Sequence, residues 1–267
     1  MWSGHIGRIG RTGDAMPDAA PRAWQVVLER IEADLREGRL SPGDRLTPER
    51  ELASTLGVGR SSVREAIRVL EVLGVVRTAT GSGPTAGAMI VTTPRGGLAA
   101  FLRLQVAANG FPIADVVRTR VVLEGDVVER LATDPEADLT EVHGILDAMD
   151  AGALTREEFL ALDARLHQAL AEASGNAVVA AMMAGLRSSI ESYTQLGAAR
   201  MSDWPSTAAR LRDEHRDIVG AVTRGDGVLA REAVRGHIAG YFRQVAEELG
   251  APADLASAES APVRGLP

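Results

Sequence analysis

The chain of 267 residues has no cysteine, which excludes disulfides, thiolate metal sites and cysteine nucleophiles and fits a reducing compartment. We therefore expect a cytoplasmic protein. Aromatic residues make up only 3% of the sequence, while alanine, valine and leucine are abundant, a composition that favours helices packed on helices. No apolar run approaches the roughly 20 residues that cross a bilayer, so we expect no membrane partner.

Lysine is also absent, so all 29 basic residues are arginines, and the net charge is −7. That charge is unevenly distributed. Residues 1–80 hold 12 arginines against 11 acidic residues, a balance of +1, whereas residues 81–267 hold 17 arginines against 25 acidic residues, a balance of −8. The larger part is a poor surface for nucleic acid, so affinity for DNA has to come from a local group of arginines in the smaller part.

Residues 45–73 have the pattern of two short helices joined by a sharp turn. Thr47 is suited to cap the first helix with its hydroxyl, and Pro48 is tolerated at the first helical position. The turn follows at Gly57-Val58-Gly59, where glycines can adopt positive φ. Apolar residues at helical spacing give each helix one buried face. They are Leu52, Ala53 and Leu56 in the first helix, and Val63, Ala66, Ile67, Leu70 and Leu73 in the second.

The other face of the second helix carries Arg60, Arg64 and Arg68, which lie four residues apart and so line one side. Arginines in this arrangement can bind phosphates or read guanine in the major groove. The alternative is a solvated helix face on which Glu65 pairs with Arg68. A predicted β-hairpin downstream, with a loop rich in glycine, proline and threonine, favours the DNA-binding interpretation. Its two expected strands are Val75–Thr78 and Met89–Thr92.

One stretch of this region resembles the winged helix-turn-helix signature of the GntR family of bacterial transcription regulators. The residues that carry the resemblance are PERELASTLGVGRSSVREAIRVLEVLG. The rest of the chain is similar to the FadR-like branch, which carries an all-helical ligand-sensing domain of the FCD type. The sequence departs from the family pattern at Gly59, where serine or threonine is usual, and in the loop 81–87, which is long and has no basic residue. The resemblance implies DNA contacts by Arg50, Arg60, Ser61, Ser62, Arg64 and, at the wing tip, Gly81.

Beyond residue 97 the pattern is helical almost to the end, and seven helices with short connections predict an antiparallel bundle. The expected helices are 98–108, 112–132, 136–150, 156–173, a stretch after Asn176 that ends near 196, 208–223 and 228–249. The fold class is therefore mostly α with one small β-hairpin. We expect five parts: a disordered arm (1–21), a winged helix-turn-helix domain (22–93), a linker (94–97), a helical domain for effector binding and dimerisation (98–250) and a flexible tail (251–267).

Only five histidines occur in the chain, and three of them lie among apolar, core-facing positions of predicted helices. His167 follows Asp163 by four residues, so the two side chains project from one helix face. His215 and His237 lie on two later helices. Three imidazoles and a carboxylate that meet inside a bundle form a site for Zn²⁺, Ni²⁺ or Mn²⁺ with coordination positions left open. The alternatives are satisfied core histidines and a simple ion pair between Asp163 and His167.

The FCD resemblance favours the metal site, because FLALDARLH, RDEHRDIVGAVTRGD and VRGHI are similar to the metal-ligand segments of that domain. It implies a divalent metal ion, Zn²⁺ before Ni²⁺ or Mn²⁺, held by Asp163, His167, His215 and His237.

Arg120 is a candidate for binding the effector. It resembles the arginine with which family members hold a carboxylate effector. The alternative is an ion pair with Glu124, four residues later, or with Asp126. Asn176 is better explained as the N-cap of the fifth helix than as a ligand contact.

Together these patterns predict a ligand-responsive transcription regulator, expected to act as a repressor and to bind a pseudo-palindromic operator as a homodimer. A metal ion and a small carboxylate effector in the helical domain would modulate operator binding. Two alternatives remain at this point. One is a metal-dependent enzyme acting on a small organic acid, although no clear second base accompanies the site. The other is an architectural DNA binder whose bundle only dimerises.

Overall fold

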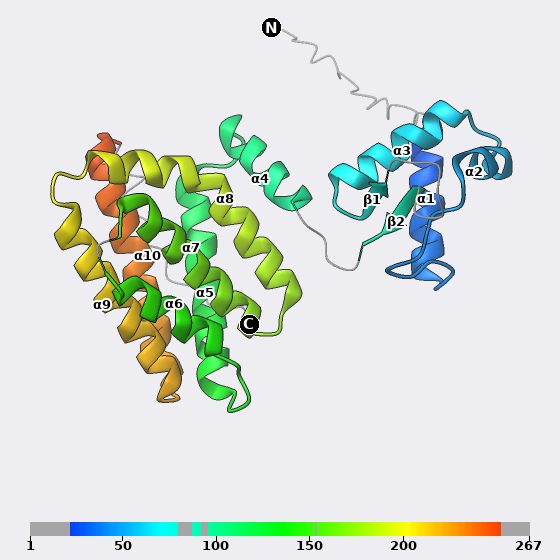
Figure 1. The fold of residues 1–267 in the computed structure, drawn as a ribbon. Helices are drawn as coiled ribbons and strands as arrows, with labels where there is room; N and C mark the ends of the chain where they lie inside the picture. Colours follow the sequence, from blue (N-terminus) through cyan, green and yellow to red (C-terminus); the bar gives the residue numbers. More distant parts are fainter. Residues whose placement is uncertain (1–21, 80–86, 92–95, 153, 252–267) are drawn as a thin grey trace, which may run out of the picture. The chain divides into compact units, whose positions relative to one another are not determined.

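The computed structural model describes residues 22–79, 87–91, 96–152 and 154–251. The chain divides into two compact units at residues 92 and 93, and both units are mostly helical (Figure 1). Across the described ranges, no helix is long and apolar enough to span a membrane. The expected arm, Gly81, the first half of the linker and nearly all of the expected tail lie outside these residues.

The described part of the first unit contains three helices and a two-stranded antiparallel sheet, which confirms the predicted helix-turn-helix with a hairpin (Figure 1). The strands pair Val76 with Ile90 and Thr78 with Ala88. Both strands lie slightly off their expected positions, the first by one residue and the second by two. The elements are α1 (Ala23–Arg36), α2 (Glu49–Leu56), α3 (Arg60–Val72), β1 (Val76–Ala79) and β2 (Gly87–Ile90).

The turn between α2 and α3 depends on Gly57, which ends α2 in the left-handed region at φ 65°. The start of α2 differs from the prediction, because Pro48 rather than Thr47 occupies the N-cap position and no side chain caps the helix. Gly59 is the N-cap residue of α3 and likewise offers no side-chain cap. The departure from the family pattern at Gly59 therefore leaves the first turn of α3 without one hydrogen-bond acceptor.

The first unit is held together by an apolar core into which α3 places one face. Val27 of α1 and Val63 and Ala66 of α3 are completely buried, and the sheet adds Val76 and Ile90. Because these residues anchor α1, α3 and the hairpin in one cluster, the opposite face of α3 is fixed toward solvent.

Within its described residues, the second unit contains seven helices, as predicted, with boundaries that differ by up to four residues. The end of the fifth helix is one such boundary, since that helix continues four residues beyond its expected end, to Arg200. The helices are α4 (Gly97–Ala107), α5 (Ile113–Thr133), α6 (Thr140–Asp150), α7 (Arg156–Ala173), α8 (Ala177–Arg200), α9 (Trp204–Thr223) and α10 (Gly227–Leu249).

Side-chain caps fix several of these helix starts. Thr155 and Glu158 form a capping box at α7. Asn176 accepts hydrogen bonds from Val178 and Val179, which confirms its expected role as the cap of α8. Asp203 accepts from Ser206 N at 3.1 Å and starts α9 four residues earlier than the periodicity predicts.

Helix α5 lies against α7, α8, α9 and α10, and most of the apolar core of this unit surrounds it. Val117, Val127, Val128 and Leu131 supply its buried face. Two charged residues, Arg120 and Glu124, share that face. The bundle therefore buries polar groups at its centre, and such groups need partners there.

Candidate metal centre and DNA-binding face

The helix-turn-helix presents its polar residues to solvent. Arg60, Ser61 and Arg64 on α3 and Arg50 on α2 are exposed, and Ser62 is half-buried. Apart from Gly81, which lies outside the described residues, the predicted DNA-contacting residues therefore lie on accessible parts of the two helices.

One of these arginines already has a partner. Arg64 Nη2 lies 3.2 Å from Glu49 Oε2, an ion pair that joins α3 to the first turn of α2. The alternative pairing of Glu65 with Arg68 is not formed between these two described residues. Because the Arg64 side chain is 54% exposed, its ion pair contributes about 1 kcal/mol at most. A phosphate or base can therefore replace Glu49 as a partner at small cost.

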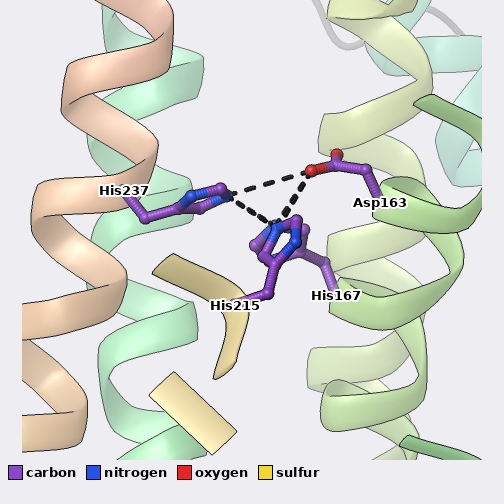
Figure 2. Close-up of side chains that lie close together, drawn as sticks. All are labelled: Asp163, His167, His215 and His237. Carbon is purple, nitrogen blue, oxygen red and sulfur yellow. Dashed lines mark hydrogen bonds and ion pairs between the residues drawn. The ribbon is translucent and has the colours of Figure 1, made fainter. Parts of the chain in front are cut away.

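In the second unit, Asp163 and His167 of α7, His215 of α9 and His237 of α10 point toward one another (Figure 2). Each offers one ligand atom, and the four atoms lie within 4.8 Å of one another. The Nε2 atom of His237 lies 3.2 Å from Nε2 of His167 and 3.2 Å from Nε2 of His215. The Oδ1 atom of Asp163 lies 3.1 Å from Nε2 of His215.

These separations fit a metal ion. A Zn–N bond of about 2.0–2.1 Å places two ligand atoms of a tetrahedral site about 3.3 Å apart. The shorter of the observed separations match that value, and the distances of 3.9 Å from Asp163 Oδ1 to His167 and His237 leave the carboxylate a small movement away. This buried cluster is thus able to bind a metal ion through three nitrogens and one oxygen.

The protonation states of these buried ligands suit a bound cation. His215 is completely buried, His167 and His237 are nearly so, and the Asp163 side chain is 20% exposed. Burial would raise the pKa of Asp163, but the hydrogen bond with His215 and the charges of the three imidazoles hold it well below its usual range. Burial and the charge of His215 lower the pKa of His237 to about 4. Asp163 is therefore anionic and His237 neutral at pH 7, as metal ligation requires.

His167 behaves differently because a carboxylate lies on its far side. Its Nδ1 atom hydrogen-bonds to Glu124. Burial lowers the pKa of His167, but its interactions with carboxylates, chiefly with Glu124, outweigh burial and raise that pKa. Burial also raises the pKa of Glu124, but His167 and Arg120 lower it to about 2. A metal ion at the Nε2 atom would replace the proton that Glu124 favours there.

Glu214 gives His237 a similar partner, since its Oε2 atom lies 2.8 Å from Nδ1 of His237. Carboxylates that bind the outer nitrogen of a ligating histidine fix the tautomer and direct the inner lone pair toward the metal. The Nδ1 atom of His215 is buried and has no hydrogen-bond partner. Two of the three imidazoles are thus oriented by carboxylates, and the third is held by packing against Phe159.

The roles of Glu124 and Glu214 were not part of the sequence-based prediction. From the sequence, Glu124 is expected only as a possible partner for Arg120, and Glu214 has no predicted role. A signal for Glu124 was available, because it occupies an inward-facing position between Val117 and Val128 on α5. Glu214 gave a weaker signal, since it is adjacent to His215 in sequence and half-buried.

Arg120 is positioned by the same network. Its Nε and Nη2 atoms lie 3.0 and 2.9 Å from Oε1 of Glu124, so the ion pair that was the alternative to effector binding is present. A cavity of about 180 Å³ begins beside it and reaches Asp163, His167 and His237. Because three of the four candidate ligand residues line this cavity, a small molecule inside it is able to reach the candidate metal position.

Comparison with known proteins agrees with both halves of this description. The family described as "Bacterial regulatory proteins, gntR family" matches residues 24–85, and the FCD domain family matches residues 115–240. The HTH-type transcriptional regulator LutR of Bacillus subtilis is 28% identical over 79% of this chain and 98% of its own length. The HTH-type transcriptional repressor NanR of Escherichia coli K12 is 28% identical over 86% of this chain and 87% of its own length.

A solved structure has the same fold. The GntR protein of Streptococcus agalactiae is similar with a TM-score of 0.56 and 24% identity, over 81% of this chain and 97% of that one. The two family matches coincide with the helix-turn-helix unit and with the helical unit that contains the metal centre. The chain therefore belongs to the GntR family of DNA-binding transcription regulators, in the FadR-like branch with a C-terminal FCD domain.

Proposed function

We propose that this regulator is a metal-containing repressor whose DNA binding responds to a small carboxylate effector. The observation that carries the proposal is the convergence of Asp163, His167, His215 and His237 inside the helical unit, beside a cavity that the first, second and fourth of them line. Zn²⁺ is the preferred ion, because three imidazoles and one carboxylate in near-tetrahedral positions suit it. Ni²⁺ and Mn²⁺ are the alternatives. The repressor assignment is supported by the similarity to NanR, which is named a repressor.

The effector is proposed to bind in the cavity, with Arg120 as one contact for its carboxylate. A guanidinium has five N–H donors, and Glu124 occupies only the Nε and Nη2 side of Arg120. Donors therefore remain for a ligand while Arg120 holds Glu124. A carboxylate or hydroxyl oxygen of the effector would add a fifth ligand to the metal, which links effector affinity to the state of the bundle.

At the operator, Arg50, Arg60, Ser61, Ser62 and Arg64 are proposed to contact DNA, and Gly81 to lie at the wing tip. Two copies would then place two recognition helices on the half-sites of a pseudo-palindrome. Helix α4 supports self-association through the helical unit, because it exposes several large apolar side chains. They include Leu98, Phe101 and Leu104. A regulator of this kind acts where the chromosome is, so we propose a cytoplasmic location.

A variant of one metal ligand tests the link between metal and response. His167→Ala should lose the metal, and a carboxylic acid that releases the wild type from operator DNA should no longer release it. The operator is first selected from random duplexes, and release is followed by fluorescence anisotropy. His143→Ala, on the exposed face of α6, is the control and should respond as the wild type does. A normal acid response in metal-free His167→Ala would refute the proposed sensor.

A further inference from the structure

A second arginine lines the cavity, and its charge is not matched by an ion pair. Arg187 lies on the inner face of α8, in register with Met183 and Ile190. Its Nη1 atom donates to the backbone carbonyl of Ala164 at 3.1 Å, and no carboxylate among the described residues pairs with it. Burial lowers the pKa of Arg187. A partly buried guanidinium with most of its donors unused is costly unless an anion joins it.

A hydroxyl group on the adjoining helix is also unused. Tyr241 of α10 lines the same cavity, and its Oη atom is buried without a hydrogen-bond partner. Burial, with the charge of Asp163, raises the pKa of Tyr241, so the phenol is protonated at neutral pH. It follows that Tyr241 has a free O–H donor beside the metal centre.

We propose that Arg187 and Tyr241 form the recognition site for the effector's carboxylate, on the cavity wall made by α8 and α10. This inference deepens the proposed function and rests on it. Arg120 and Arg187 then have different tasks. The charge of Arg120 is balanced by Glu124, through which it positions His167, whereas the charge of Arg187 is available to pair with a ligand. Arg120 thus donates hydrogen bonds to the effector, and Arg187 neutralises the charge of the effector's carboxylate.

The same arrangement narrows the class of effector. A cavity of about 180 Å³ is smaller than the roughly 300–1,000 Å³ of sites for drug-sized ligands, so the acid is short. One end meets Arg187 and Tyr241, while an oxygen at the other end would join a metal ion held by the four protein residues as a fifth ligand. The effector is therefore a short acid with a further hydroxyl, oxo or carboxylate oxygen rather than an unsubstituted fatty acid.

The test uses the full-length, zinc-loaded protein. Glycolate, lactate, pyruvate, malate, citrate and gluconate are screened by thermal shift, with butyrate as the unsubstituted comparison, because a bound ligand raises the melting temperature. The acid with the largest shift is then titrated calorimetrically into the wild type and four variants. Two variants lie in the cavity, Arg187→Gln and Tyr241→Phe. Two are matched controls, Arg118→Gln on exposed α5 surface and Tyr193→Phe, whose hydroxyl is also buried and unpartnered but does not line the cavity.

Arg187→Gln should weaken binding of the acid by about 10- to 100-fold, because a charge-assisted contact is lost. Tyr241→Phe should weaken it by about 3- to 10-fold, while both controls stay within about twofold of the wild type. Arg187→Lys keeps the charge and should retain part of the affinity, which separates lost recognition from misfolding. The metal content of all variants should equal that of the wild type.

Two results would overturn the inference, and they have different consequences. If Arg187→Gln binds the acid as tightly as the wild type does, Arg187 is not the recognition site, but the acid-sensing function stands. If no substituted acid stabilises the wild type, or if butyrate binds best, the inference fails together with the effector part of the proposed function. Metal content and DNA affinity, measured on the same samples, then decide separately whether the rest of the proposed function stands.

Discussion

The two units of this regulator hold their functional residues in opposite ways. In the helix-turn-helix unit, Arg60 and Arg64 are exposed on one helix and need only that helix to be presented correctly. In the helical unit, the candidate metal centre is buried and drawn from three helices, with candidate ligands separated by up to 74 positions from Asp163 to His237. The proposed DNA-contacting face is therefore encoded locally, whereas the candidate metal centre forms only after the bundle has folded.

The difference predicts how mutations in each unit behave. An exposed arginine can be removed with little effect on folding, because no buried group loses its partner. Removal of a residue from the buried centre should destabilise the fold, because the remaining ligands and their carboxylate partners stay desolvated and unpaired. Variants of the first kind should affect DNA binding alone, and variants of the second kind should affect metal binding and stability together.

Arg64→Ala should give the largest separation between the two units. We expect operator binding to weaken by about 1–3 kcal/mol, with unchanged metal content and a melting temperature close to that of the wild type. Fluorescence anisotropy on a selected operator measures the loss, and Arg36→Ala, an exposed arginine of α1 paired with Glu32, is the control. Wild-type operator affinity in Arg64→Ala would show that α3 does not contact DNA as proposed.

Glu214→Gln should affect the helical unit and leave DNA binding by the helix-turn-helix unit unchanged. Loss of the carboxylate beside His237 should weaken metal affinity by about 10- to 100-fold, because that carboxylate fixes the tautomer of the ligating imidazole. Competition with a chelator of known affinity measures the change. Glu172→Gln, on an exposed residue paired with Arg165, should leave it unchanged. Equal metal affinity in both variants would remove Glu214 from the centre.

Gly59→Ser should produce the smallest effect and should sharpen the comparison within the first unit. Gly59 has ordinary φ and ψ angles of −70° and 146°, and an added Cβ would lie 3.4 Å from the nearest side-chain atom. A serine there can cap α3, so we expect the free energy of unfolding to rise by a few tenths of a kcal/mol, about the usual difference between serine and glycine caps. Urea denaturation measures it.

Gly57→Ser is the matched control for that substitution. Gly57 has a φ of 65°, a conformation that side-chain-bearing residues rarely adopt, so this variant should be less stable by about 1 kcal/mol. If both substitutions change stability in the same direction, the capping argument is wrong.

Much of this architecture could be predicted from sequence, because it follows from local patterns. The glycine turn, the apolar face of α3 and the seven helical periods each depend on residues close together in the chain. Boundaries were less accurate where capping competes with periodicity. Asp203 starts α9 early, whereas α6 begins at Thr140 without a side-chain cap, after a turn in which Asp138 Oδ1 accepts from Thr140 N.

The candidate site was predictable only in part. The spacing of Asp163 and His167 and the scarcity of histidine indicated a centre, but spacing alone left ion pairs and core histidines open. The roles of Glu124 and Arg187 were harder to predict, because the role of a charged residue on an inner helix face depends on the helices packed against it. Their partners lie on α7, which is distant in sequence from both.

The central claim is that the buried cluster is a metal centre, and elemental analysis of the purified protein tests it most directly. The wild type is compared with Asp163→Ala, His215→Ala and the control His143→Ala after equal exposure to Zn²⁺. We predict about one divalent ion per chain in the wild type and the control, as expected for one four-ligand site, and none in the two ligand variants. A wild type that takes up no metal, or ligand variants that retain it, would contradict the account.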